Sequence, residues 1–195
     1  KPSHLFPRYP LKKNMNNRFM LRALELARKG KTTPNPMVGA VLVKNNRIIA
    51  EGFHSRAGGP HAEVVALRKA GSKARGADLY VNLEPCCHMG RTSPCTDAII
   101  KSGVSRVVAG MKDPNKLMQG KGIRILKAAG IKVSAGIMRN DCEKLNEVFV
   151  KVMKTDMPFV TVKTAMSLDG KIATREGDSQ WISGVKARDF VHELR

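Results

Sequence analysis

Residues 61–86 read HAEVVALRKAGSKARGADLYVNLEPC, and the rest of the fold can be worked out from this stretch. Its first part, residues 61–71, spaces apolar side chains at helical intervals and ends in glycine, which predicts an amphipathic helix. Its last part, residues 78–84, is a largely apolar run that stops at Pro85, which predicts a buried strand. A helix followed at once by a buried strand is typical of α/β folds.

The alternation of helix and strand continues on both sides of this stretch. Asn45 and Asn46 lie between two apolar runs and predict a β-hairpin turn. The further predicted helices are 17–30, 94–103, 120–130 and 139–154, and the further predicted strands are 38–43, 47–53, 105–110 and 131–136. Strands joined through helices imply crossover connections, so we expect an α/β fold, a three-layer α/β/α sandwich around a mixed sheet.

The pattern restarts near residue 155. We expect a strand from residue 157, then a loop, then a helix from about residue 183 that still continues at residue 195. This segment is interpreted as the incomplete beginning of a second domain. The expected organisation is a basic extension over residues 1–14, one domain over 15–154 and the start of another over 155–195.

The composition is that of a soluble globular protein and excludes collagen-like, disulfide-dense and membrane-spanning classes. The chain has 195 residues, 35 Lys and Arg against 16 Asp and Glu, and a net charge of +19. This charge favours anionic partners, although on charge alone a solvated lysine-rich surface is the better explanation. With no secretory signal and four cysteines, a cytoplasmic, reducing location is expected, with no membrane partner.

Four residues near the ends of predicted elements suggest a zinc site. His61 and Glu63 open one helix, Cys86 follows a strand, and Cys95 opens another helix. One imidazole and two thiolates are typical zinc ligands, and three protein ligands leave the fourth position for water, as in catalytic sites. Glu63 is then placed to take a proton from that water and to pass it to a leaving nitrogen.

The pattern H-x-E with a later P-C-x-x-C is the signature of zinc nucleobase deaminases, and here eight residues instead of two separate the cysteines. Three alternatives stay open. The first is a structural zinc site closed by Cys87 or His88, and the second is a zinc-stabilised binding module. The third is a nucleic-acid or nucleoside deaminase of the same fold, although the chain lacks the short cysteine spacing and a cluster of aromatic residues for stacking.

Six separated motifs resemble, in order, the bifunctional pyrimidine deaminase and reductase family of riboflavin biosynthesis. They are TPNPMVGAV (33–41), GFH (52–54), GGPHAEVVAL (58–67), NLEPCCHMGRTSPC (82–95), MKDPNKLMQGKG (111–122), and VKTAMSLDGKIA (162–173) together with SQWIS (179–183). The resemblance covers about residues 15–195. It implies a cytidine-deaminase-like first domain and a second domain similar to dihydrofolate reductase.

In that family the substrate is 2,5-diamino-6-ribosylamino-4(3H)-pyrimidinone 5′-phosphate, which loses its 2-amino group as ammonia to give 5-amino-6-ribosylaminouracil 5′-phosphate. The resemblance implies that His61, Cys86 and Cys95 hold Zn²⁺ and that Glu63 moves the proton. It also implies substrate contacts, which are expected at Asn35, His54, His88 and Arg91. The family has Cys then Ser where this chain has Cys86 and Cys87, and we expect the first cysteine to be the ligand because it directly follows proline.

For the reductase part, the resemblance implies an NADPH site and a site for the ribosyl phosphate. The cofactor contacts would be Ala165 and Trp181, and the substrate contacts would be Lys163, Ser179 and Arg195. We expect no reductase activity from these 195 residues alone, because one strand, one loop and one helix bury too little surface to hold a dinucleotide. The expected partner is a phosphorylated pyrimidine, not a nucleic acid, with a homo-oligomer or a separate reductase as further possibilities.

Overall fold

The computed structural model describes residues 15–90 and 92–194. The expectations for the extension over 1–14, for Arg91 and for Arg195 therefore lie outside the described residues. Contacts divide the chain into two units, one ending at Pro158 and one beginning at Phe159, and each is treated separately below.

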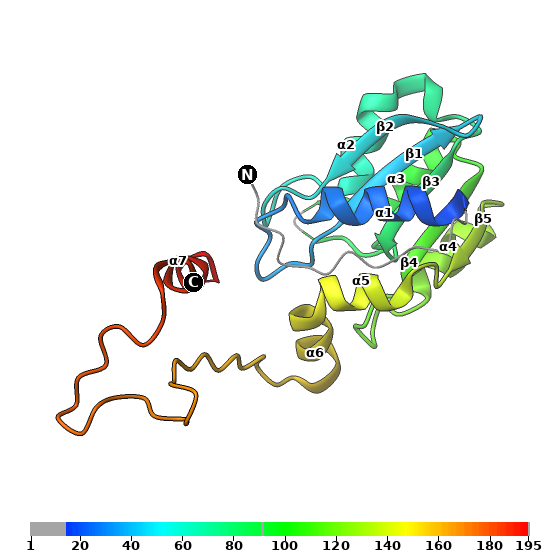
Figure 1. Cartoon of the computed structure of the whole chain (residues 1–195). Coiled ribbons are helices and arrows are strands. Elements are labelled where there is room, and N and C mark those ends of the chain that lie inside the picture. Colours follow the sequence, from blue (N-terminus) through cyan, green and yellow to red (C-terminus); the bar gives the residue numbers. More distant parts are fainter. Residues whose placement is uncertain (1–14, 91, 195) are drawn as a thin grey trace. The chain divides into compact units, whose positions relative to one another are not determined.

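The first unit is built on one mixed five-stranded sheet of order β2-β1-β3-β4-β5 (Figure 1). β1 pairs antiparallel with both β2 and β3, whereas β3, β4 and β5 run parallel. The strands are β1 (Gly39–Lys44), β2 (Arg47–Phe53), β3 (Asp78–Leu83), β4 (Arg106–Met111) and β5 (Lys132–Ala135). The mixed sheet predicted from the alternation of elements is thus confirmed.

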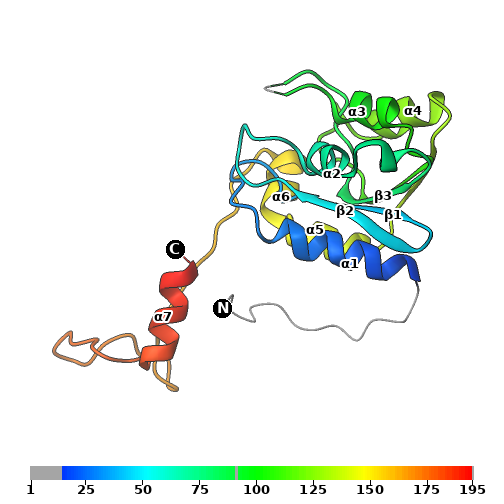
Figure 2. The same ribbon diagram turned by 90° about the horizontal axis from the view of Figure 1, so that it is seen from above.

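Helices cover both faces of this sheet, which confirms the three-layer α/β/α architecture (Figure 2). α1 (Met15–Ala27) and α5 (Arg139–Leu145) pack on one face. The other face carries α2 (Ala62–Ala70), α3 (Cys95–Ser102) and α4 (Lys121–Ala128), with a 3₁₀ turn over Gly71–Ala74. β3 and β4 lie between the layers, and five of the six side-chain positions in each are buried.

Local chemistry explains the hairpin and the close packing of α1. Asn45 and Asn46 have φ values of 49° and 60°, the left-handed conformation that a tight two-residue hairpin requires and that asparagine tolerates. At the other end of β1, a Cβ on Gly39 would lie 2.0 Å from the carbonyl oxygen of Ala23 in α1. Glycine therefore lets helix and strand backbones touch at this point.

Two predicted elements are wrong. The single helix expected over 139–154 is two helices, α5 and α6 (Glu147–Thr155), because Asn146 between them has a non-helical conformation, with φ −111° and ψ 27°. Its side chain bonds the backbone of Met37 instead. The strand expected from residue 157 does not form either. A strand needs a partner for its backbone groups, and residues 157–167 have no ladder pairing with any part of the chain that the structure describes.

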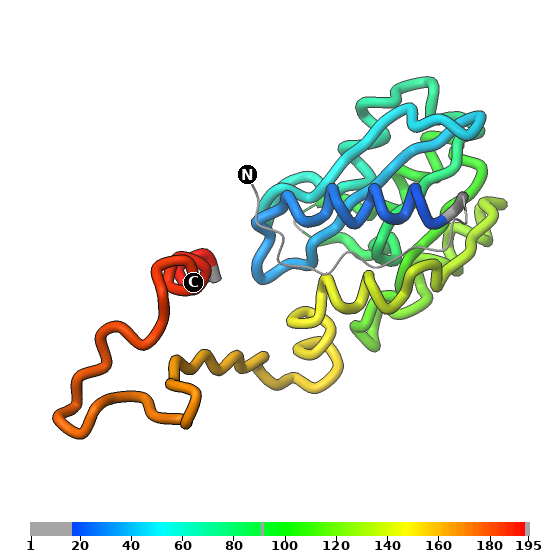
Figure 3. Tube along the Cα trace, in the orientation of Figure 1, coloured from blue at the N-terminus to red at the C-terminus, as the bar shows by residue number. Residues whose placement is uncertain are grey.

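The second unit contains α7 (Val185–Leu194), close to the helix predicted from residue 183. An irregular path over residues 159–184 leads to it, as the tube in Figure 3 shows. Among the described residues, no helix is both long and apolar enough to cross a membrane.

Candidate metal centre and active site

His61 and Glu63 lie where the chain enters α2. His61 is the N-cap residue, in an extended conformation, and its side chain makes no capping hydrogen bond to the helix. Its ring therefore stays available to other groups. Glu63 lies in the first turn and is only 3% exposed. The positive end of the helix dipole favours negative charge at this position.

Two cysteine sulfurs meet the ring of His61. Cys86 follows β3 and Pro85, and Cys95 is the first residue of α3. The His61 Nδ1 atom lies 3.1 Å from the Cys95 Sγ and 3.4 Å from the Cys86 Sγ, and the three ligand atoms all fall within 4.8 Å of one another. When the His, Cys, Asp and Glu side chains of residues 15–90 and 92–194 are compared, these three form the group that could hold a metal ion. Cys87 is not part of that group.

The hydrogen bonds of this cluster stabilise negative charge on one sulfur. Hydrogen bonds from Cys95 and from His61 lower the pKa of the Cys86 thiol to about 4. Cys95 keeps its proton in that bond, so the pKa of its thiol is raised. The hydrogen bond to Cys86 in turn raises the pKa of His61 above its ordinary value.

The same donors fit zinc. Zn²⁺ binds thiolates and neutral imidazole, and it replaces the protons that the two sulfurs and the imidazole otherwise share. Three protein ligands are the set of a catalytic site, in which the fourth position is left for water. Glu63 lies beside this cluster, and burial raises the pKa of its carboxyl to about 7.

His54 and Asn35 form a second pair of polar groups near the cluster. The Nδ1 atom of His54, which is 3% exposed, lies 3.0 Å from the carbonyl oxygen of Pro60 and therefore donates to it. Its Nε2 atom lies 3.3 Å from the Asn35 side-chain nitrogen and accepts from it. This pattern corresponds to a neutral imidazole, and it leaves the Asn35 side-chain oxygen as an acceptor for another group.

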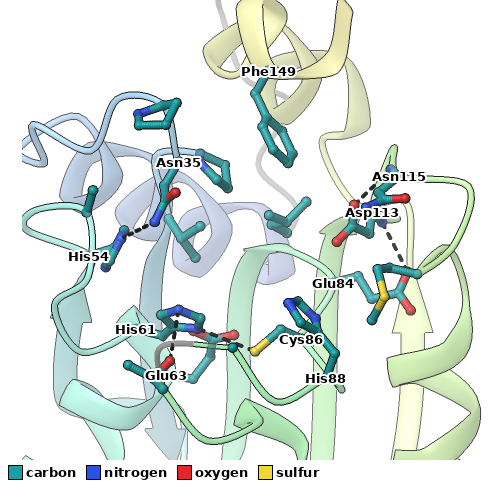
Figure 4. A pocket seen from close by; sticks show the side chains of 18 of the residues that line it. Asn35, His54, His61, Glu63, Glu84, Cys86, His88, Asp113, Asn115 and Phe149 are labelled. Carbon is teal, nitrogen blue, oxygen red and sulfur yellow. Dashed lines mark hydrogen bonds between the residues drawn. The ribbon is translucent and has the colours of Figure 1, made fainter. Parts of the chain in front are cut away.

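A cavity of about 490 Å³ joins these groups, with His61, Glu63 and Cys86 at its floor (Figure 4). Asn35, His54 and His88 also line it, so the structure brings together six of the eight side chains that the sequence singled out for the deaminase. Cys95 is fully buried and does not line the cavity, although its sulfur belongs to the cluster. Arg91 is outside the described residues.

Several residues at the cavity were missed in the sequence. Thr92 places its hydroxyl 3.3 Å from the Nε2 atom of His61. Glu84, which is 4% exposed, accepts hydrogen bonds from the backbone N–H groups of Asp113, Gly120 and Ile123. Further lining residues are Asp113, Asn115, Met118, Phe149 and Met153. The motif at 111–122 marked part of this set, but no local pattern assigned its residues a role.

The residues expected to serve a reductase site belong to the second unit. Lys163, Ser179 and Trp181 are exposed, and Ala165 is half-buried. The Trp181 ring is covered on one side by the guanidinium of Arg188, whose carbon lies 4.0 Å from the ring centre.

Comparison with known proteins identifies the family. The model of the cytidine and deoxycytidylate deaminase zinc-binding region matches residues 13–111, and the RibD C-terminal domain model matches residues 158–195. The chain is 54% identical to the riboflavin biosynthesis protein RibD of Escherichia coli K12 over 179 residues, which are 91% of this chain and 49% of that protein.

Solved structures agree with this result. The RibD structure of Acinetobacter baumannii, form 1, superposes with a TM-score of 0.90 at 51% identity, over 93% of this chain and 51% of that one. The diaminohydroxyphosphoribosylaminopyrimidine deaminase/5-amino-6-(5-phosphoribosylamino)uracil reductase of Thermotoga maritima gives a TM-score of 0.87 at 50% identity, over 93% and 53%. The chain spans about half the length of these relatives. It therefore belongs to the cytidine and deoxycytidylate deaminase zinc-binding family, and within that family it is a RibD homologue.

Proposed function

We propose that this protein is a zinc-dependent hydrolase that deaminates 2,5-diamino-6-ribosylamino-4(3H)-pyrimidinone 5′-phosphate to 5-amino-6-ribosylaminouracil 5′-phosphate in riboflavin biosynthesis. The observation that carries the proposal is the meeting of one imidazole, two thiols and a buried carboxyl at one cavity. The name of the Thermotoga maritima relative, a deaminase and reductase, supports the choice of substrate.

In this proposal His61, Cys86 and Cys95 are the zinc ligands and Glu63 is the acid–base group. Zinc in such a site makes water nucleophilic at neutral pH. Glu63 takes a proton from the water at a carboxylate oxygen and delivers it to the departing amino nitrogen. Water adds its oxygen to C2 of the ring, the C2–N bond breaks, and ammonia leaves, so a ring carbonyl replaces the amino group. The burial of Glu63 supports this role, because bulk water does not compete for its proton.

The substrate would be held by the polar groups around the cavity. Asn35 is oriented by its hydrogen bond to His54, and its side-chain oxygen, which accepts no hydrogen bond from the described residues, suits an N–H group of the pyrimidine. His88 lines the cavity and is exposed, which suits a contact with the ribosyl phosphate. We assign Arg91 to the same phosphate by its position in the sequence, since a guanidinium binds phosphate through two parallel hydrogen bonds.

For the rest of the chain we keep the division proposed from the sequence, with a deaminase domain over 15–154 and reductase sequence over 155–195. The match of the RibD C-terminal domain model to residues 158–195 supports it. In that assignment Ala165 and Trp181 contact NADPH, whereas Lys163, Ser179 and Arg195 contact the ribosyl phosphate. None of the four cysteines forms a disulfide, which agrees with the proposed reducing compartment such as the cytoplasm.

A deaminase that acts on nucleic acid or on nucleosides is the weaker candidate, because this chain is identical to RibD proteins at about half of the aligned positions. Ammonia release by the purified zinc-loaded chain separates the two. We expect release from the diaminopyrimidine phosphate and none from cytidine or single-stranded RNA. Release from cytidine or RNA, with none from the pyrimidine phosphate, would overturn the proposal.

A further inference from the structure

The side chains of two buried asparagines, Asn82 and Asn146, bond the backbone of Met37. The Met37 N–H donates to the Asn146 side-chain oxygen at 2.8 Å. The Met37 carbonyl oxygen accepts from the side-chain nitrogen of Asn146 at 3.0 Å and from that of Asn82 at 2.9 Å. Asn82 is 0% exposed and Asn146 is 4% exposed, so water does not compete for these bonds.

Met37 ends the loop that carries Asn35 to the cavity. The loop is stiff within itself, because Pro34 and Pro36 flank Asn35, and because the Asn35 N–H donates to the Thr32 carbonyl oxygen at 2.7 Å. A stiff loop moves as one piece about its ends. The position of Met37, together with the bond from Asn35 to His54, therefore sets where the amide of Asn35 lies over the floor of the cavity.

Asn146 also directs the opposite wall of the cavity. It ends α5 and begins α6, and its side chain is committed to Met37 instead of to a helix end. α6 carries Phe149 and Met153 to the cavity, and Figure 4 shows the Phe149 ring pointing into it. One side chain, 109 positions from Met37 in the sequence, thus joins the Asn35 loop to the α6 wall.

We propose that Asn146 is a positioning residue that fixes the Asn35 loop and the α6 wall at their separation across the cavity. In the described part of the chain its side-chain hydrogen bonds go to Met37 and not to the proposed metal ligands or to Glu63, which lie at the starts of α2 and α3 and after β3. Its loss should therefore weaken substrate binding and leave metal binding intact. This inference rests on the proposed function for its kinetic readout only.

The kinetic test is a double-mutant cycle between Asn146→Leu and Asn35→Ala, assayed by ammonia release from the diaminopyrimidine phosphate. We expect Asn146→Leu to lower kcat/KM by about 10- to 100-fold, mostly through KM, with zinc content unchanged. In the Asn35→Ala background the same change should cost at least about threefold less, because the group that it positions is gone. Asn140→Leu, at an exposed site on α5, is the matched control and should change neither constant.

The proposal would be overturned if Asn146→Leu lowered kcat/KM by the same factor with and without Asn35→Ala. A normal KM in the zinc-loaded Asn146→Leu protein would also overturn it. If this variant does not fold, Asn146→Asp is used, since it keeps the shape and the acceptor for the Met37 N–H but loses the donor. Hydrogen exchange over residues 33–38 needs no turnover and should quicken in the Asn146 variants and not in the Asn140 variant. Lack of turnover by the unaltered chain would refute the proposed function, whereas unchanged exchange would refute this inference.

Discussion

Replacing Glu63 with glutamine tests both the proposed chemistry and the effect of the buried carboxyl on the stability of the fold. Glutamine has nearly the shape of glutamate, but it neither takes up nor releases a proton near neutral pH. Since Glu63 is 3% exposed, bulk water has little access to replace the missing proton carrier. Glu63→Gln should therefore remove acid–base catalysis without opening a cavity.

The expected loss of activity is large. A positioned acid–base group contributes about 10²- to 10⁴-fold to a rate, and the burial of Glu63 places the loss near the upper end, about 10⁴-fold in kcat. Zinc content should stay at the level of the unaltered protein, because the proposed ligands His61, Cys86 and Cys95 are unchanged in this variant.

Although Glu63→Gln should lower activity, it should raise the stability of the metal-free protein at alkaline pH. Burial raises the pKa of Glu63 from 4.5 to about 7 in the folded protein. Below pH 4.5 the carboxyl is protonated in both the folded and unfolded states. Between pH 4.5 and 7 the folded state binds more protons, so stability falls as the pH rises. Above pH 7 the ionised carboxyl lowers the free energy of unfolding by its full amount. This is about 3 kcal/mol, since each unit of the pKa shift corresponds to about 1.4 kcal/mol.

Glutamine carries no such cost, so metal-free Glu63→Gln should exceed the metal-free unaltered protein in stability at pH 8 and match it near pH 4.5. Urea unfolding with a chelator present, at both pH values, measures the difference, and ammonia release after zinc loading measures the catalytic loss. A variant with full zinc and activity within tenfold of normal would refute the catalytic role. A stability difference that does not change between the two pH values would refute the electrostatic reasoning.

Two further comparisons test the metal ligands and the packing. Cys86→Ser should lose zinc and ammonia release, whereas Cys87→Ser should keep both, because of these two sulfurs the one of Cys86 lies beside the imidazole of His61. Metal analysis of the purified variants measures this difference. Loss of zinc from Cys87→Ser but not from Cys86→Ser would reverse the assignment. Gly39→Ala should lower the free energy of unfolding by more than about 2 kcal/mol, since the new Cβ would lie 2.0 Å from the Ala23 carbonyl oxygen. Gly184→Ala, which meets nothing within 4 Å, should change it by less than about 1 kcal/mol, and equal urea midpoints for the two would contradict the close approach.

Much of the fold followed from short-range signals. The apolar periodicity of residues 61–71 and the run at 78–84 predicted a helix and a strand that the structure contains as α2 and β3. The expectation of a helix through 139–154 was wrong because periodicity does not register a hydrogen bond to a distant residue. Asn146 bonds Met37, and that contact breaks the helix.

The chemical types at the candidate site were also readable in the sequence. A histidine, a glutamate two residues later and two cysteines beside proline point to zinc and proton transfer because ligand preference and acidity are properties of single side chains. The contributions of Glu84 and Phe149 to the cavity were not readable, since each reaches it through contacts between elements far apart in the chain.

The amino-acid sequence by itself determined most helices and strands of the first unit, though not the break between α5 and α6, and it determined the donors that are offered to a metal, because both depend on neighbouring residues. The tertiary structure alone decided that His61 Nδ1 comes within 3.4 Å of both sulfurs, that Glu63 is shielded from water, and that Asn146 holds the opposite walls of the cavity together. These properties arise when segments dozens of residues apart pack against one sheet, and the burial that results sets both the distances and the pKa values.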